Sequence, residues 1–338
     1  MPKVSVVIPI NTRSHFLGEA IQSVLDQTLQ DFEIIVVDNG LLENTGEVVE
    51  GFHDARIKYL RRDFRYIGMA QNIGFKAAAG EYITGLTADD LYLPRNLEMK
   101  AKLLDARPDV GLVCSDAYIF NHHTGDNICK LWGDPKGPYP WFDPARAVRQ
   151  PLREVLANGC FFNVQAGMVR RTIFNEVGYF DESLPSHEDW EMCIRIVQRF
   201  PIEVINTPLL KIRQRRISYS LLQENDCIGG VAATRKLIRS GTLSRNERKL
   251  LKERMLPRHI HHGRTALQDG RTATARKALL AGIRLDPWNL KLYVYLLFSI
   301  PGIGKYLALR KWRRLAGRRL FRSRSAGGDC YHDGRILS

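Results

Sequence analysis

The sequence lacks an apolar run long enough to cross a bilayer. The stretch from Leu292 to Ile300 is far shorter than the roughly 20 residues that a membrane-spanning helix needs. The N-terminal segment MPKVSVVIPI has no charged leader, long apolar core and cleavage site in succession. We therefore predict neither a spanning helix nor a secretory signal.

Cysteine is scarce and irregularly spaced. None of the six cysteines forms a Cys-x-x-Cys pair, and an even count alone does not imply disulfides in a chain of this length. Reduced thiols in a cytosolic protein are the favoured interpretation. The cysteines are Cys114, Cys129, Cys160, Cys193, Cys227 and Cys330.

No glycine-rich loop follows the first apolar run. After VSVVIP the chain continues as INTRSHFLG, without the G-x-G-x-x-G spacing of dinucleotide-binding enzymes. This absence argues against a dinucleotide-dependent oxidoreductase. A sugar nucleotidyltransferase also needs an early glycine-rich loop, so the sequence disfavours that class too.

Acidic residues are scarce in the C-terminal third. Residues 225–338 hold 25 Lys and Arg against 7 Asp and Glu, whereas residues 1–224 hold 25 against 29. The net charge of +14 therefore comes from the C-terminal part, and we expect an acidic partner to bind there. We predict two regions, 1–224 and 225–338.

Short β-branched runs alternate with helical patterns in the first region. This alternation predicts an α/β fold with a mainly parallel sheet flanked by helices. The predicted strands are Val4–Pro9, Glu33–Asp38, Arg56–Leu60, Glu81–Leu86 and Val110–Ser115. The predicted helices are Ser14–Gln27, Met69–Ala79, which would stop at Gly80, and Leu93–Asp105.

The rest of the chain divides into a loop region and a helical region. Residues 121–160 are rich in Gly, Pro and aromatic residues, which predicts a long loop. Helix and strand resume at about 152–207. After residue 225 the pattern becomes basic and helical, and Thr265–Leu296 predicts two antiparallel helices without a second copy of the unit.

Acidic residues follow two of the predicted strands. Asp38 ends EIIVVD, and Asp89 and Asp90 end EYITGLTADD. Ligands of parallel sheets bind beyond the carboxyl ends of strands, so these acids are expected in one site. Adjacent carboxylates repel each other unless a cation or hydrogen bonds offset the repulsion, and hard divalent cations prefer oxygen ligands. The alternatives are that Asp38 caps a turn and that Asp90 caps a helix.

A further acidic pair, Glu188 and Asp189, lies at the head of an amphipathic helical pattern. Such a pair suits a general base, because one carboxylate orients or tunes the other. The alternative is that both acids are favoured there by the helix dipole.

Four segments occur in a fixed order along the chain. They are VSVVIPINTR, EIIVVDNG, GMAQNIGFKAAAGEYITGLTADDLYLPRNLE and MVRRTIFNEVGYFDESLPSHEDWEMCIRI. Their order and spacing resemble the motifs of the family-2 inverting glycosyltransferases, over roughly residues 3–220. The resemblance implies a GT-A-type domain that transfers a sugar, with inversion, from a UDP-, dTDP- or GDP-sugar to a hydroxyl of a saccharide or lipid-linked acceptor. It also implies a role in bacterial surface polysaccharide or glycolipid synthesis.

The resemblance implies roles for individual residues. Asp189 would be the catalytic base with Glu188 beside it, and Asp89 would bind the Mg²⁺ or Mn²⁺ ion that bridges the diphosphate. The basic pair Arg170 and Arg171 falls where members of the family often have two basic residues that flank the acceptor side. The implied donor-binding residues are Pro9, Asn11, Arg13, Asp38, Gln71, Ala88, Asp89 and Arg215.

Several positions depart from the family pattern. They are Asn11-Thr12 in place of Tyr-Asn, Gln71 in place of Arg, Thr87 in place of the first acid of D-x-D, and Arg215 in place of His. These departures leave open a catalytically inactive binding or scaffold protein, although the retained acids favour an enzyme. The Q-x-x-R-W signature of processive members is missing, which favours single additions. Arg215 has a guanidinium that can bind phosphate oxygens.

The segment Lys305–Arg324 holds nine Lys and Arg, no acid, and interleaved aromatic and aliphatic residues. On a helix this composition is typical of segments that lie in the interface of anionic membranes. A solvated tail and nucleic-acid binding are the alternatives, but the charge of −4 on residues 1–224 argues against a large nucleic-acid footprint. We predict a cytoplasmic protein, peripheral on the inner face of the plasma membrane, that binds an anionic membrane surface and no nucleic acid.

Overall fold

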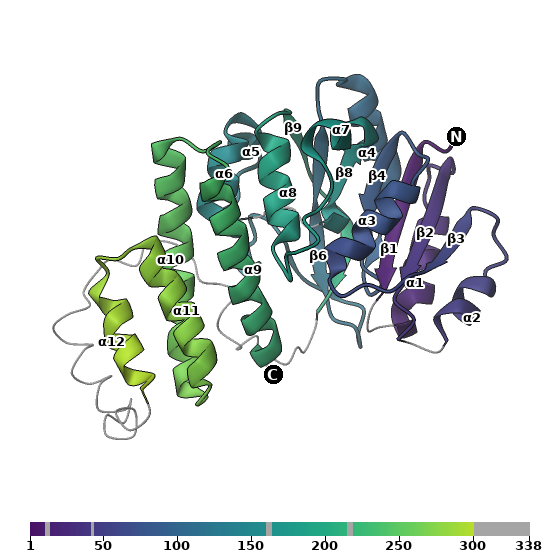
Figure 1. Cartoon of the computed structure of the whole chain (residues 1–338). Coiled ribbons are helices and arrows are strands. Elements are labelled where there is room, and N and C mark those ends of the chain that lie inside the picture. Colours follow the sequence, from purple (N-terminus) through teal and green to yellow (C-terminus); the bar gives the residue numbers. More distant parts are fainter. Residues whose placement is uncertain (11–13, 42–43, 160–163, 215–218, 301–338) are drawn as a thin grey trace. The chain divides into compact units, whose positions relative to one another are not determined.

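The computed structural model describes residues 1–10, 14–41, 44–159, 164–214 and 219–300 (Figure 1). These residues form two compact units, and the division between them falls at residue 216. The first unit is an α/β structure, and the second is helical.

The first unit is built on a nine-stranded mixed sheet in the order β3-β2-β1-β4-β8-β6-β9-β5, with β7 paired to β6. Strands β3, β2, β1 and β4 are parallel to one another, and β8 is antiparallel to both β4 and β6. Strand β9 is parallel to β6. Strand β5 pairs antiparallel with β9, and β7 pairs antiparallel with β6. The strands are β1 (Val4–Ile10), β2 (Phe32–Asp38), β3 (Ile57–Arg61), β4 (Tyr82–Gly85), β5 (Leu91–Tyr92), β6 (Leu112–Phe120), β7 (Asn127–Lys130), β8 (Gly167–Arg170) and β9 (Ile202–Arg213).

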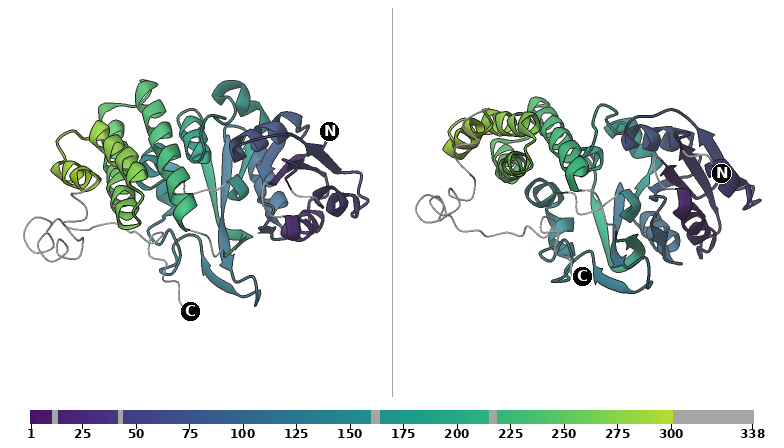
Figure 2. Two further views of the ribbon diagram at one scale, coloured as in Figure 1. Left: turned by 60° about the horizontal axis from the view of Figure 1, so that its bottom comes forward. Right: turned by 90° about the horizontal axis from the view of Figure 1, so that it is seen from below.

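Helices cover both faces of this sheet (Figure 2). Every residue of β1 and β2 is buried, as expected of parallel strands that are enclosed on two sides. The predicted α/β class with a mixed sheet and flanking helices is confirmed. The helices of this unit are α1 (Leu17–Leu25), α2 (Thr45–Glu50), α3 (Ile67–Ala77), α4 (Asn96–Ala106), α5 (Pro144–Arg149), α6 (Pro151–Asn158), α7 (Phe174–Val177) and α8 (Glu188–Val197), with short 3₁₀ turns at Ser14–Phe16, Val164–Ala166 and Arg171–Ile173.

Gly80 does not end helix α3, contrary to the prediction. The helix ends at Ala77, and its C-cap Ala78 is extended. A Cβ on Gly80 would lie 2.7 Å from the backbone nitrogen of Ser5, and the Gly80 amide donates to the Ser5 hydroxyl over 2.8 Å. Glycine is therefore required here because β4 begins against the backbone of β1, and the sequence signal reflects packing rather than helix capping.

Residues 121–159 are more regular than the predicted long loop. They contain β7, α5 and α6. Pro144 and Pro151 stand at the starts of the two helices, and the Asp143 side chain accepts a hydrogen bond from the amide of Ala145. Proline is favoured in the first turn of a helix, so two of the residues that suggested a loop instead mark helix starts.

The second unit consists of helices among its described residues, as predicted. They are α9 (Tyr219–Arg239), α10 (Arg245–Gln268), α11 (Thr272–Leu285) and α12 (Leu290–Phe298). Ser244 and Glu247 form a reciprocal capping box at the start of α10. A Cβ on Gly263 would lie 2.5 Å from a Leu279 methyl group, so α10 and α11 approach closely there. Among the described helices, none is both long and apolar enough to cross a membrane.

Candidate active site at the carboxyl edge of the sheet

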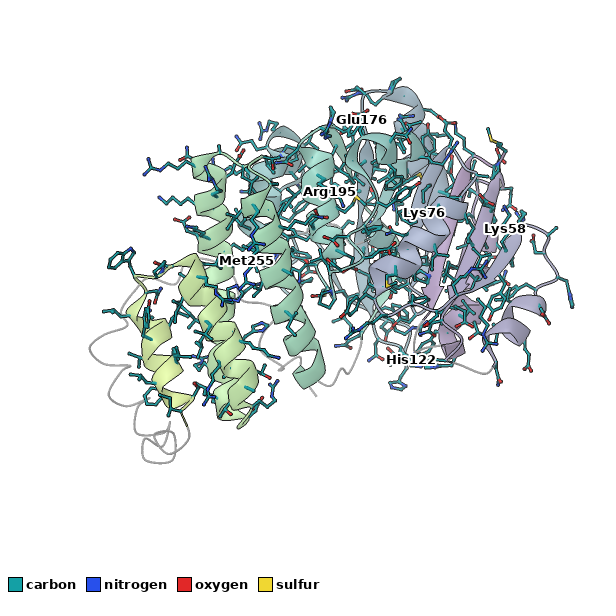
Figure 3. The ribbon with its side chains drawn as sticks, viewed as in Figure 1. Lys58, Lys76, His122, Glu176, Arg195 and Met255 are labelled. Atoms are coloured by element: carbon teal, nitrogen blue, oxygen red, sulfur yellow. The ribbon has the colours of Figure 1, made fainter. Side chains whose placement is uncertain are left out.

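The strand directions bring several polar residues to one edge of the sheet. Because β8 is antiparallel to both β4 and β6, the carboxyl ends of β4, β6 and β9 lie on the same side as those of β1 and β2. Asp38 ends β2, Asp89 follows β4, and Arg213 ends β9. His122, just after β6, is at this edge, at the bottom of the view in Figure 3. This edge is where α/β sheets bind ligands.

Asp38 is buried and holds both the following turn and the neighbouring strand. Its Oδ1 accepts the amide of Gly40 over 2.9 Å, and its Oδ2 accepts the hydroxyl of Tyr59 over 2.5 Å. Burial and this bond raise the pKa of Tyr59 to about 12, so the tyrosine remains a donor. Asp38 therefore does cap the following turn, as the alternative interpretation holds. Binding of a base or ribose by Asp38 stays a prediction.

Asp90 joins three segments and does not cap a helix, because the two-residue strand β5 follows it. Its carboxylate accepts the Arg213 amide over 2.9 Å and the Gln165 side chain over 3.2 Å. The Thr87 hydroxyl also donates to it. Thr87 thus has a structural partner at the position where the family usually has an acid.

Asp89 is buried beside Asp90, with 4 % of its surface exposed. The guanidinium Nε of Arg213 donates to the Asp89 carbonyl over 2.7 Å. Sequence reasoning missed Arg213 and considered Arg215 in the same R-Q-R segment instead. The signal that points to Arg213 is its place at the end of a strand whose carboxyl end reaches the edge that carries Asp89.

The pair Glu188 and Asp189 begins helix α8. His187 precedes them in a left-handed conformation, with φ of 63°, and the Trp190 amide donates to Asp189 over 2.6 Å. Glu188 is buried and Asp189 is half-buried. Burial and the adjacent Asp189 carboxylate raise the pKa of Glu188. The two acids therefore differ in burial, and burial favours the protonated form of Glu188.

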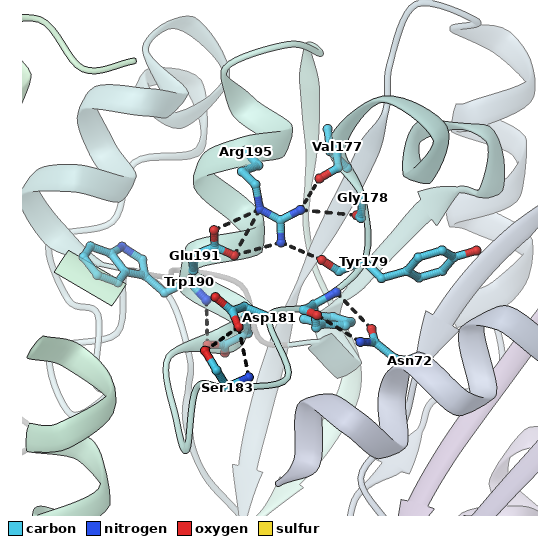
Figure 4. A network of polar contacts seen from close by, with 11 residues as sticks. Asn72, Val177, Gly178, Tyr179, Asp181, Ser183, Trp190, Glu191 and Arg195 are labelled. Carbon is cyan, nitrogen blue, oxygen red and sulfur yellow. Dashed lines mark hydrogen bonds and ion pairs between the residues drawn. The ribbon is translucent and has the colours of Figure 1, made fainter. Parts of the chain in front are cut away.

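A network of polar contacts fixes the loop that leads to this pair (Figure 4). Asn72 of α3 exchanges two hydrogen bonds of 2.9 Å with the backbone of Phe180. The guanidinium of Arg195 binds the Glu191 carboxylate and the carbonyls of residues 177–179. Two helices thereby hold residues 177–180, close in sequence to the head of α8.

The other predicted donor-binding residues divide into described and undescribed positions. Pro9 is buried on β1 opposite Val37, and Ala88 is buried next to Asp89. Gln71 is buried on α3, and its Oε1 has no hydrogen-bond partner among the described residues. Asn11, Arg13 and Arg215 lie outside the residues that the structure describes.

Arg170 and Arg171 lie at the opposite edge of the sheet, contrary to the expected place on the acceptor side. Arg170 pairs with Tyr82, at the start of β4. The Arg170 side chain donates to the Leu104 carbonyl over 2.8 Å, and that of Arg171 to the Gly80 carbonyl over 2.8 Å. Arg171 therefore binds a backbone carbonyl just before β4, and Arg170 binds one in the last turn of α4.

Comparison with known families identifies the fold and the family. Residues 5–177 match the family model described as glycosyl transferase family 2. The chain belongs to this family. A glycosyltransferase of Rickettsia felis, otherwise uncharacterized, is 29 % identical over 214 residues, which is 63 % of this chain and 34 % of the relative. The chain thus spans about a third of that relative's length. Glycosyltransferase GlyG of Streptococcus pneumoniae is 27 % identical over 208 residues, 57 % of this chain and 67 % of the relative.

Solved glycosyltransferases share the fold of this family-2 chain. S. aureus TarS 1–349 superimposes with a TM-score of 0.64 at 16 % identity, over 94 % of this chain and 93 % of TarS 1–349. Other TarS structures are complexes with UDP and with UDP-GlcNAc. The mannosyltransferase PcManGT of Pyrobaculum calidifontis, in complex with GDP-Man and Mn²⁺, superimposes with a TM-score of 0.56 at 17 % identity, over 94 % and 84 % of the two chains. The predicted GT-A-type fold and the predicted membership of glycosyltransferase family 2 are confirmed.

A divalent cation at the candidate site would find few side-chain ligands close together. In the described parts of the chain, no three His, Cys, Asp or Glu side chains lie together as a ready metal site. Mg²⁺ is commonly bound by one or two carboxylates together with phosphate oxygens and waters. Asp89 at the carboxyl edge fits that arrangement, in which the substrate supplies the remaining ligands.

Proposed function

We propose that this glycosyltransferase transfers a sugar, with inversion, from a nucleotide-diphosphate donor to an acceptor hydroxyl, with Asp189 as the general base. One observation carries the proposal. At the head of α8 the buried Glu188 has a raised pKa, whereas its neighbour Asp189 is half-buried and keeps part of its surface exposed. A carboxyl group with a raised pKa beside a second carboxylate is typical of acid–base sites.

The proposed reaction needs a base on the acceptor side. Asp189 takes the proton of the acceptor hydroxyl, and the oxygen attacks the anomeric carbon opposite the diphosphate. The bond from that carbon to the diphosphate oxygen breaks as the new glycosidic bond forms, so the configuration inverts. Glu188 keeps its proton and leaves the negative charge on Asp189.

The donor would bind at the carboxyl edge of β1, β2 and β4. Asp38 and Pro9, near the carboxyl ends of β2 and β1, would hold the base and ribose, and Asp89, after β4, would face the diphosphate. The nucleotide complexes of TarS and PcManGT support a UDP- or GDP-sugar as donor, and the proposal of a dTDP-sugar rests on the family resemblance. A Mg²⁺ or Mn²⁺ ion held by Asp89 and the diphosphate would neutralise the charge of the leaving group.

We further propose a non-processive role in bacterial surface polysaccharide or glycolipid synthesis, at the inner face of the plasma membrane. The predicted membrane-binding segment Lys305–Arg324 lies outside the described residues. Support within the described residues comes from the apolar side chains of Trp288, Leu290 and Leu297, which are exposed in the helical unit. The acceptor would be a saccharide or a lipid-linked sugar, and no nucleic acid would be bound.

A catalytically inactive binding protein is the second candidate, and the Thr87 substitution motivates it. The hydrogen bond from Thr87 to Asp90 weakens that motive, because threonine has a structural reason to stand there. The two candidates differ in one measurable property, which is turnover of the donor.

The test measures donor consumption by the purified full chain. A panel of UDP-, dTDP- and GDP-sugars is incubated with Mg²⁺ or Mn²⁺, and donor hydrolysis and transfer to added saccharides are recorded. Asp189→Asn should lower the rate by about 10²–10⁴ while nucleotide binding persists. Asp89→Ala should weaken nucleotide binding in the presence of Mn²⁺.

Asp109→Asn is the matched control, because this exposed acid precedes β6 at the opposite edge. Its rate and nucleotide affinity should equal those of the wild type. A wild type that binds nucleotide sugars but turns none of them over would favour the inactive binding protein. An Asp189→Asn variant with wild-type turnover would exclude Asp189 as the base.

A further inference from the structure

Arg213 is a buried arginine at the carboxyl edge, with 4 % of its side chain exposed. All three of its side-chain nitrogens have partners. Nε donates to the Asp89 carbonyl over 2.7 Å, Nη2 donates to a Glu19 carboxylate oxygen over 2.8 Å, and Nη1 contacts Nδ1 of His122. A buried charge is tolerated when it is paired and hydrogen-bonded in this way.

The main chain of Arg213 adds a second link to the same turn. Its amide donates to Asp90 over 2.9 Å, so residues 89 and 90 are each bonded to Arg213. The guanidinium also lies 3.9 Å from the ring centre of Phe16 and 4.9 Å from that of Phe120. The turn after β4 is thereby tied to the end of β9 through both backbone and side chain.

The contacts of Arg213 join segments that are far apart in the sequence. Glu19 belongs to α1, Asp89 follows β4, His122 follows β6, and Arg213 ends β9. A planar guanidinium with donors in a rigid fork can satisfy three such partners at once, which a lysine ammonium on a flexible chain cannot do with the same geometry.

We propose that Arg213 is a positioning residue that holds the backbone at Asp89, and with it the carboxylate that faces the donor diphosphate. This role rests on the proposed function of Asp89. Arg213 is not a diphosphate ligand, because it is buried and its nitrogens are already bonded to protein atoms. It acts through the geometry of the turn at residues 87–90.

The first test needs no nucleotide. Backbone hydrogen exchange of residues 87–92 is compared in the full chain for the wild type, Arg213→Met and Arg213→Lys. Loss of buried hydrogen bonds to a charged group corresponds to about a tenfold or larger change in a local equilibrium, so exchange there should accelerate by about that factor in both variants. Where Arg213→Met does not fold, Arg213→Lys decides.

Arg170→Met is the matched control. Arg170 also donates to a backbone carbonyl, over 2.8 Å, but at the opposite edge of the sheet. Its replacement should leave exchange at residues 87–92 at the wild-type rate. If the Arg213 variants exchange at these residues as slowly as the wild type, the positioning role is wrong.

The second test links the turn to the donor site. Calorimetric titration with UDP, dTDP and GDP in the presence of Mn²⁺ should give a dissociation constant about tenfold higher or more for Arg213→Lys than for the wild type, and no change for Arg170→Met. Equal affinities of Arg213→Lys and wild type would overturn the link to the diphosphate. A wild type that binds none of these nucleotides would overturn the proposed function, and the exchange measurement would still decide whether Arg213 holds the turn.

Discussion

The amino group of Lys100 is buried in the first unit and has no hydrogen-bond partner among the described residues. Lys100 belongs to α4, and its nitrogen lies 5.7 Å from the ring centre of Tyr92. Burial lowers the pKa of Lys100 from 10.5 to about 7. The unfolded chain therefore binds a proton that the folded chain gives up between these pH values.

Replacing Lys100 with Met is expected to stabilise the fold. The free energy of unfolding of the wild type should rise with pH between about 7 and 10.5, because the unfolded chain binds more protons in that window. Lys100→Met should lack this rise and be more stable near neutral pH, by on the order of 2–4 kcal/mol. Urea unfolding across that window measures both effects. An equal pH dependence in the two proteins would show that Lys100 is not buried as described.

Glu188 gives a pH dependence of the opposite sign. Its raised pKa means that the folded chain keeps a proton that the unfolded chain has lost. The contribution to stability is complete below the ordinary value of 4.5 and disappears as the pH rises through the raised pKa. Glu188→Gln is always neutral, so its stability relative to the wild type should increase from about pH 5 to about pH 9. Unfolding midpoints at the two pH values measure this trend, and an opposite trend would contradict the raised pKa.

At the scale of an element, helix α3 holds the loop before α8 through Asn72. Asn72→Ala removes two hydrogen bonds to Phe180 and should cost about 1–3 kcal/mol of stability. Because the loop leads to Asp189, transfer should fall while nucleotide affinity is retained. Ile73→Ala, a half-buried residue of the same helix, controls for general loss of helix packing. If both variants lose transfer in proportion to stability, the loop contact has no specific role.

Individual strands and helices also show how far the structure can be predicted from the sequence. Strands β1, β2, β4 and the start of β6 were predictable, because buried strands are continuous apolar runs. The two-residue strand β5 was not predicted. The short strand β8 was not, since its antiparallel place between β4 and β6 depends on pairing across long sequence distances. The acids of the site follow strand ends or begin a helix and could be found in the sequence. Arg213 also ends a strand, but its role could not be predicted, because its partners come from segments that only the fold brings together.

At the scale of the whole molecule, the C-terminal region has both an excess of basic residues and exposed apolar side chains. Residues 225–338 carry an excess of 18 positive charges, from 25 basic and 7 acidic residues. In the same region Trp288 is 90 % exposed, Leu290 77 % and Leu297 54 %. Exposed apolar side chains in a region with an excess of basic residues are typical of proteins that bind anionic membranes through their interface. Both features lie outside the unit that carries the candidate active site, so binding and catalysis can be tested separately.

The last prediction uses this separation. The full chain should sediment with anionic liposomes at low salt, less at high salt because screening weakens the attraction, and little with neutral liposomes. A variant with Trp288→Ser, Leu290→Ser and Leu297→Ser keeps every charge but loses the apolar insertion, so it should bind anionic liposomes more weakly. Leu41→Ser is the matched control, since Leu41 is 74 % exposed in the other unit, and it should sediment like the wild type.

Deletion from Lys305 onward measures how much of the liposome binding comes from the basic C-terminal segment. If the wild type does not sediment with anionic liposomes at low salt, the membrane role is wrong. If the triple variant sediments fully, the attachment depends on charge, and the exposed side chains of α12 and its preceding turn have another partner.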